Sequence, residues 1–274
     1  MYHDVTAPGH EDKSGFPGGE AARYKLDPGL FRRHLQAIRD RVEAAPITAD
    51  RLRSADRARS IPLLLTFDDG GASGVAIADE LEAFGWRGHL FVTAGYVDRP
   101  GFLTRAAIRD LTRRGHIVGS HSWSHPLRMA HCSRQRLGEE WRRSVKHLSE
   151  IIGAPVRTAS VPGGDYSAAV GEQAAAAGIE VLFTSRATTR VARLDSLLVV
   201  GRYPVNRATT PERAAAVAAG ARAPRLRQLA WWDLKTLAKS AGGSGYLRVR
   251  EALLGRSPDV TWGDEVASLS EDPS

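Results

Sequence analysis

Two adjacent carboxylates stand at the end of an apolar run in the first third of the chain. Residues 61–67 are apolar except for Pro62 and Thr66, and Asp68 and Asp69 follow at once. Such a run, bounded by a turn signal, is typical of a strand buried on both faces. Like charges held this close disfavour each other's ionisation, and a cation beside them removes that cost. The pair therefore indicates a cation site, although a polar turn that merely ends a strand fits the same residues.

A pair of histidines follows about fifty residues later. His121 and His125 are four residues apart, a spacing that places two side chains on one face of a helical turn. Neutral imidazole is a common ligand of zinc and similar metals. Because Pro126 ends any regular helix here, we expect a short turn after a strand at 116–119. Each histidine alone is more often structural than a metal ligand. The pair of aspartates and the pair of histidines together, however, predict a metal site.

The surrounding sequence must bring these two turns together. Strand and helix patterns alternate from the first carboxylate onward, which predicts a mainly parallel sheet covered by helices. In such folds the chemistry gathers at the carboxyl ends of the strands, where both turns are expected. Spacing alone permits either a barrel or an open sheet. The expected strands lie at 61–67, 88–93, 116–119, 156–161 and 181–184, and the expected helices at 75–84, 104–114, 133–152, 167–178 and 211–220.

Composition fits one globular enzyme domain. The chain has 274 residues and one cysteine, Cys132, so no intramolecular disulfide can form. No signal segment and no apolar run of about 18 residues is present, which predicts a cytoplasmic protein. Met1 falls inside an expected strand, so the start could lie upstream and a leader could be missing. The net charge of +7 suggests acidic partners such as anionic glycans, but without a DNA- or RNA-binding motif we expect no nucleic-acid partner.

The C-terminal part differs in composition from the rest. We expect a catalytic domain at 1–210, a basic helical extension at 211–256 and a disordered tail at 257–274. The extension interleaves arginines and lysines with leucines and with Trp231 and Trp232. Such a stretch can lie on an anionic membrane surface, which would make the protein membrane-peripheral. A helix that packs on the main domain with its charges in water explains the pattern more simply.

Several motifs resemble those of a known family. Thr-Phe-Asp-Asp-Gly at 66–70 and His-Ser-Trp-Ser-His at 121–125 look like the first two signature motifs of polysaccharide deacetylases, the NodB-homology domains of carbohydrate esterase family 4. The segments 88–93 and 114–121 add supporting matches, and the resemblance covers roughly residues 60–205. The opening Tyr-His-Asp-Val resembles that of an exopolysaccharide deacetylase subgroup. The resemblance implies a distorted (β/α)7 barrel, here with a helical C-terminal extension.

The resemblance also implies a reaction. It identifies Asp69, His121 and His125 as ligands of one divalent metal ion, zinc with cobalt or nickel as alternatives, and Asp68 as the general base. A bound metal lowers the pKa of water and polarises a carbonyl, which suits hydrolysis of the amide in N-acetylated sugars of a polysaccharide or glycan. The metal site does not select the acyl group, so another amide or ester remains an alternative substrate.

The third motif departs from the family pattern. Many members carry Arg-x-Pro-Tyr at the next strand end, whereas Ser160 takes the arginine's place here. The orientation of the base carboxylate, which the family gives to that arginine, is therefore in question. Pro162 and Gly163 suit a tight loop whose backbone N–H groups could face a substrate or its oxyanion. Tyr166 could stack on a sugar ring or merely pack within the loop.

A second departure concerns the general acid. The family usually carries a late histidine in this role, but no histidine follows His147. We select His3 as the candidate, because its strand should lie beside the Asp68 strand; a buried strand-end histidine is the alternative. In the later segment 201–207, expected to form a last strand and loop, Arg202 or Arg207 could contact a substrate. The two departures leave open a catalytically weak relative that binds a glycan or another partner.

Overall fold

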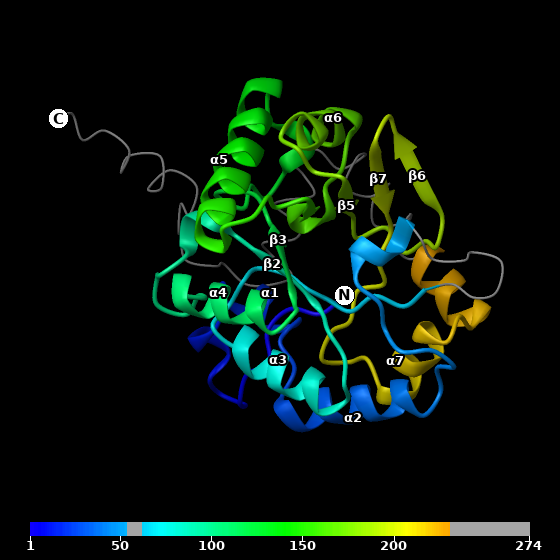
Figure 1. Ribbon diagram of the computed structural model, residues 1–274. Coiled ribbons are helices and arrows are strands. Elements are labelled where there is room, and N and C mark those ends of the chain that lie inside the picture. The colour runs from blue at the N-terminus through cyan, green and yellow to red at the C-terminus, as the bar shows by residue number, and fades with distance from the viewer. Residues whose placement is uncertain (54–61, 231–274) are drawn as a thin grey trace.

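A curved seven-stranded sheet forms the centre of the molecule (Figure 1). The computed structural model describes residues 1–53 and 62–230. The strand order is β1-β2-β3-β4-β5-β7-β6, and neighbouring strands are parallel except for the antiparallel β6–β7 pair. The strands are β1 Thr66–Phe67, β2 His89–Val92, β3 Ile117–Ser120, β4 Thr158–Ser160, β5 Val181–Phe183, β6 Val191–Leu194 and β7 Leu197–Val200.

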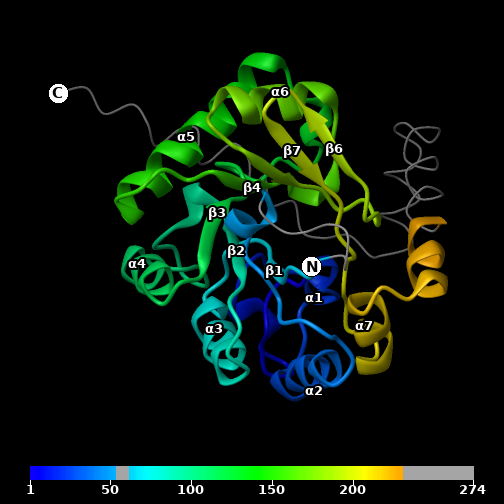
Figure 2. The same ribbon diagram turned by 45° about the vertical axis from the view of Figure 1, so that its right-hand side comes forward.

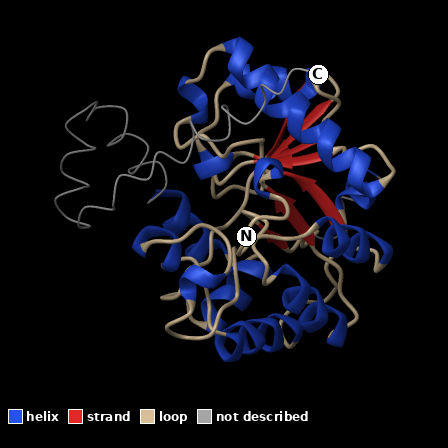
Figure 3. Cartoon of the chain, turned by 90° about the vertical axis from the view of Figure 1, so that its left-hand side faces the viewer, coloured by secondary structure: helices blue, strands red, loops and turns tan. Residues whose placement is uncertain are grey.

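Helices cover the outer surface of this sheet (Figures 2 and 3). Some of them begin or end where the sequence supplies a cap: Asp27 accepts from Leu30 N at the start of α2, and left-handed Gly153 ends α5. α5 buries an apolar stripe that includes Leu137, Trp141 and Leu148, which excludes water from the outer face of the sheet. The helices are α1 Gly19–Ala22, α2 Pro28–Arg39, α3 Gly74–Ala83, α4 Arg105–Arg113, α5 Arg134–Ile152, α6 Ala168–Ala176 and α7 Pro211–Ala218.

The N-terminal segment closes the gap between β1 and the chain that follows β7. Tyr2 N donates to Thr66 O, and Asp68 N donates to Tyr2 O, so this segment lies beside β1 as predicted. On its other side, Val205 N donates to Met1 O at 2.9 Å. The sheet is therefore a distorted barrel rather than an open sheet, and the predicted fold class is confirmed.

Some elements differ from the prediction. β1 is only two residues long, because Leu65 and its predecessors do not pair along a full strand. The β6–β7 hairpin, which the sequence analysis missed, turns through left-handed Asp195. Its short, largely exposed β6 lacks the apolar run of a buried strand. Residues 201–207 form no strand, since the chain leaves the sheet after β7.

The expected extension is described only in part. It contains α7, which packs against α2, and a helical run at 222–230. Trp231, Trp232 and the tail at 257–274 lie outside the described residues, so the domain limits and the membrane contact stay predictions. Among the helices of the described ranges, none has the length and apolar character that crossing a membrane requires.

Candidate active site

Three potential metal ligands converge at the carboxyl end of the sheet. Asp69 stands in the turn after β1, and His121 and His125 stand in the turn after β3. His121 Nε2 lies 3.4 Å and His125 Nε2 3.5 Å from Asp69 Oδ1, and one ligand atom from each residue lies within 4.8 Å of the others. Asp69 and His121 are buried, while the His125 side chain is 17% exposed. A carboxylate and two imidazoles with an accessible side suit a catalytic divalent metal, so the predicted ligands fit that ion.

Two of these ligands have an unusual backbone. Asp69 has a φ of 77° and His125 a φ of 59°, and Ser122 between the two histidines has a φ of 63°. Left-handed conformations cost non-glycine residues about 1–3 kcal/mol each and persist where the surroundings over-determine them. Gly70 extends the first turn at a φ of 79°, and a Cβ there would lie 2.9 Å from Val92 Cα. The turns are therefore shaped for ligation at some cost in stability.

Ser160 connects His121, a potential metal ligand, to Asp68, the expected base. His121 Nδ1 lies 3.0 Å from Ser160 O and 2.6 Å from Ser160 Oγ. Ser160 Oγ in turn donates to Asp68 Oδ1 at 3.1 Å. This network closes when His121 carries its proton on Nδ1, which leaves the Nε2 lone pair for a metal. The residue in the place of the family's arginine thus fixes the ligand's tautomer.

Arg202 is the charged partner of Asp68, the expected base. Its Nη1 lies 2.6 Å from Asp68 Oδ1 and its Nη2 2.8 Å from Asp68 Oδ2, so the ion pair is bidentate. Burial alone would raise the pKa of Asp68, but the charge and hydrogen bonds of Arg202, together with the charges of His121 and His3, outweigh burial and lower the pKa to about 2. Asp68 is therefore an ionised acceptor next to the ligand turn.

The guanidinium is itself fixed in place. Arg202 Nε donates to Thr184 O at 3.1 Å, and its Cζ lies 5.6 Å from the Phe91 ring centroid and 5.9 Å from that of Phe183. Arg202 is 5% exposed, so it orients the base rather than facing a substrate directly, which corrects our expectation. The other arginine considered, Arg207, forms a separate ion pair with Glu11.

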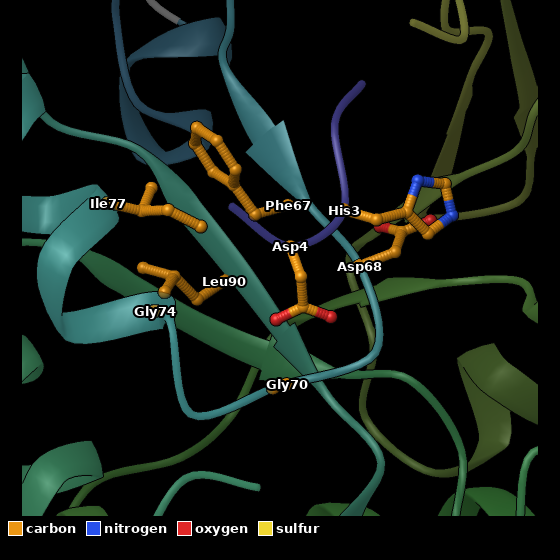
Figure 4. Close-up of a pocket in the computed structure, with 9 residues that line it drawn as sticks. His3, Asp4, Phe67, Asp68, Gly70, Gly74, Ile77 and Leu90 are labelled. Carbon is orange, nitrogen blue, oxygen red and sulfur yellow. The ribbon is translucent and has the colours of Figure 1, made fainter. Parts of the chain in front are cut away.

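His3 lies beside the Asp68 carboxyl (Figure 4). Its Nδ1 is buried without a hydrogen-bond partner in the described structure, and its ring lies 4.9 Å from that of Tyr24. Burial lowers the pKa of His3, while the nearby charges of Asp69 and Asp68 oppose that shift. The structure thus brings His3 to the site, and its role as an acid stays a prediction.

The residues of the loop that we expected to bind substrate differ in how far they are free to do so. Pro162 is buried and begins a tight turn, in which Gly163 has a φ of 59°. The amides of Gly164 and Tyr166 donate within the turn, to Val161 O and Gly164 O, so they do not face a substrate here. Tyr166 is 38% exposed, and its ring lies against Gly171 of α6. That contact favours packing for Tyr166, while substrate binding by this loop stays a prediction.

A buried carboxylate also supports the turn that carries Asp69. Asp4 Oδ1 accepts from Ser14 Oγ at 2.6 Å and from Ser73 Oγ at 2.7 Å. Asp4 Oδ2 has no partner among the described residues, and Figure 4 shows the carboxyl directed toward Gly70 at a cavity of about 10 Å³, the size of one water. Sequence reasoning found neither this cluster nor the pairing of Arg202 with Asp68, because their partners lie far apart along the chain.

Comparison with known proteins finds a family model that resembles the part of the chain with these motifs. Residues 56–182 match the family model described as polysaccharide deacetylase. An uncharacterized 30.6 kDa protein of Geobacillus stearothermophilus is 32% identical over 93 residues, which is 33% of this chain and 33% of that protein. The aligned stretch thus spans about a third of the length of that relative.

Solved structures share the fold over a larger part of the chain. A polysaccharide deacetylase from Bacillus cereus matches with a TM-score of 0.66 at 20% identity, covering 80% of this chain and 67% of the other. IcaB from Ammonifex degensii gives 0.64 at 23% identity, covering 75% and 94%. The Streptococcus pyogenes deacetylase PplD gives 0.64 at 18% identity, covering 77% and 93%. Over residues 56–182 the chain is similar to a polysaccharide deacetylase, and this stretch contains both motifs and all three potential ligands.

Proposed function

We propose that the protein is a metal-dependent hydrolase that removes acetyl groups from N-acetylated sugars of a polysaccharide or glycan. The observation that carries this proposal is the placement of Asp68, an ionised and bidentately held carboxylate, directly beside the group formed by Asp69, His121 and His125. Zinc is the metal that best suits one carboxylate and two imidazoles, with cobalt and nickel as alternatives. An exopolysaccharide is the substrate class that the opening Tyr-His-Asp-Val favours.

The chain's own groups account for the proton transfers. A bound metal would polarise the acetyl carbonyl and acidify a water. Asp68 would accept a proton from that water. Arg202 fixes the orientation of the Asp68 carboxylate and favours its ionised form. The oxygen of the deprotonated water bonds to the acetyl carbon, and the C–N bond then breaks as the amine takes a proton, so acetate and a free amino sugar leave. We assign the delivery of that proton to His3, and its position in the same pocket as Asp68 supports this assignment (Figure 4). His3 must first receive a proton, because burial lowers its pKa.

A direct assay tests the reaction. Purified, metal-loaded protein should release acetate from N-acetylglucosamine oligomers, and chelation followed by return of zinc should abolish and restore that release. Asp68→Asn should reduce the rate by at least about 10²-fold while the metal stays bound. His3→Ala should cost about 10²-fold if His3 is the acid, and a loss under about threefold would retire that role. Acetate release that persists unchanged in Asp68→Asn would overturn the proposed mechanism.

The runner-up proposal is a glycan-binding relative with little activity. Its support is the missing arginine and the missing late histidine. Arg202, which holds Asp68 from another strand end, removes the first of these two grounds, and His3 is the group that we propose in place of the second. The hydrolase is therefore the better proposal, and a different amide or ester substrate is the alternative within the same chemistry. A substrate screen with the metal-loaded protein distinguishes these acyl groups.

A further inference from the structure

The turn that carries both histidines is held by a side chain outside the motif. Glu140, on α5, is buried and points its carboxylate at the backbone of this turn. Its Oε2 accepts from Trp123 N at 3.0 Å and from Ser124 N at 2.8 Å, and its Oε1 accepts from Ser124 Oγ at 2.6 Å. One carboxylate therefore satisfies three donors of the two residues that precede His125.

The same face of α5 makes further contacts with the motif. Ser144 Oγ lies 2.7 Å from Ser120 Oγ, directly before His121. The Trp123 ring lies 4.3 Å from Arg143 Cζ and 5.7 Å from the His147 ring, in edge-on contact. Residues 140, 143, 144 and 147 are spaced as neighbours on one helix face, so α5 presents a continuous support to the turn.

This support matters because the turn is strained where it ligates. Ser122 and His125 both have left-handed backbones, and Ser122 Oγ accepts from His125 N at 3.1 Å. A turn with two such residues needs external contacts to keep one shape. The contacts of Glu140 fall between these two residues and fix the peptide groups that aim the His125 ring.

We propose that Glu140 is a positioning residue for metal binding, which holds the 121–125 turn in the shape that directs His121 and His125 at one ion. This inference rests on the proposed function. Glu140 itself contacts neither the metal ligands' ring nitrogens nor the site where substrate would react. Its effect should therefore appear first in metal affinity, because residues that orient metal ligands typically change affinity by 10- to 100-fold.

The test measures zinc and cobalt binding to metal-free protein by calorimetry or chelator competition. Glu140→Leu should weaken affinity by about 10- to 100-fold and alter the visible spectrum of the cobalt form. Glu140→Gln should lose about three- to tenfold, because its carbonyl oxygen still accepts from the turn. The matched control is Glu139→Gln, the same change at the adjacent exposed residue of α5, which should leave affinity unchanged.

Two outcomes would overturn the inference. If both Glu140 variants bind metal as the wild type does, with only a lower melting temperature of the metal-free protein, Glu140 is merely structural and the proposed function stands. If the wild type binds neither zinc nor cobalt, the proposed function fails and the inference fails with it. If Glu140→Leu does not fold, the test uses Glu140→Gln alone. A metal affinity of Glu140→Gln equal to that of Glu139→Gln would then refute the positioning role. Faster hydrogen exchange at Trp123 N and Ser124 N in metal-free Glu140→Gln would support it.

Discussion

The two halves of the site are built in different ways. In the metal half, Asp69, His121 and His125 come from two short turns, and each motif is contiguous in the sequence. In the base half, Asp68 is held by Ser160, 92 residues away, and by Arg202, 134 residues away. The first half is thus local and the second is assembled across the barrel.

This difference separates two physical tasks. Ligation needs donor atoms at fixed mutual distances, which a turn supplies if its backbone is held. Orientation of a base needs only a charged partner of correct geometry, and any strand end that faces the lumen can present one. The family resemblance implies an arginine at the position of Ser160. Here Arg202, just beyond the end of β7, supplies the guanidinium instead. Mutations in the two halves should separate metal affinity from rate.

The largest effect should come from Arg202→Met. Asp68 would remain buried without its ionic partner, which costs about 3–5 kcal/mol of unfolding free energy. The rate of acetate release should fall by at least about 10²-fold, because the base loses its orientation. Metal affinity should stay within about threefold of the wild type, since no ligand contacts Arg202 in the described structure. Unfolding in urea, steady-state kinetics and calorimetry measure the three quantities.

Arg207→Met is the control for this substitution. Its ion pair with Glu11 is exposed at the arginine, and such pairs contribute about 0–1 kcal/mol. Stability and rate should therefore change little. A loss of metal affinity in Arg202→Met as large as its loss of rate would show that the two halves are not separable.

The same difference explains what the sequence could predict. The apolar run before Asp68 and the spacing of His121 and His125 are local signals. They were enough to predict that Asp69, His121 and His125 come together as potential ligands. No local signal joins Arg202 to Asp68 or Glu140 to Ser124. The first contact exists only after the barrel closes, and the second only after α5 packs against the turn that follows β3. The β6–β7 hairpin was missed for a related reason: its pairing is local, but its exposed strand carries little apolar pattern.

Ser160→Ala should have a smaller effect on both halves. It removes the hydroxyl that donates to Asp68 Oδ1 and contacts His121 Nδ1, while the Ser160 carbonyl still accepts from that nitrogen. Because Arg202 still holds Asp68, we expect the rate to fall by about three- to tenfold, and metal affinity by less than about threefold. A loss of rate as large as that of Arg202→Met would mean that the serine, rather than the arginine, orients the base.

The smallest effect on the reaction itself is expected behind Asp69, where a substitution should change stability in a pH-dependent way. Burial raises the pKa of Asp4 to about 6, although hydrogen bonds from Ser14 and Ser73 oppose that shift. The folded state therefore holds the Asp4 proton more tightly than the unfolded state does. This group stabilises the fold at low pH, and that stability is lost as the pH rises from about 4 to about 6.

Asp4→Asn should remove this dependence, because the amide stays neutral and its oxygen can still accept from both serines. The measurement is the unfolding free energy of the variant minus that of the wild type, both in the presence of a chelator. This difference should be more positive at pH 8 than at pH 4.5 by on the order of 1–3 kcal/mol. Asp195→Asn, the same change at an exposed turn, should show no such difference. A variant destabilised equally at both pH values would mean that Asp4 acts as an ionised anchor, held by its serines and by the charge of Lys25. The metal half would then resemble the base half, with a buried charge rather than a neutral hydrogen-bonded group behind its ligand turn.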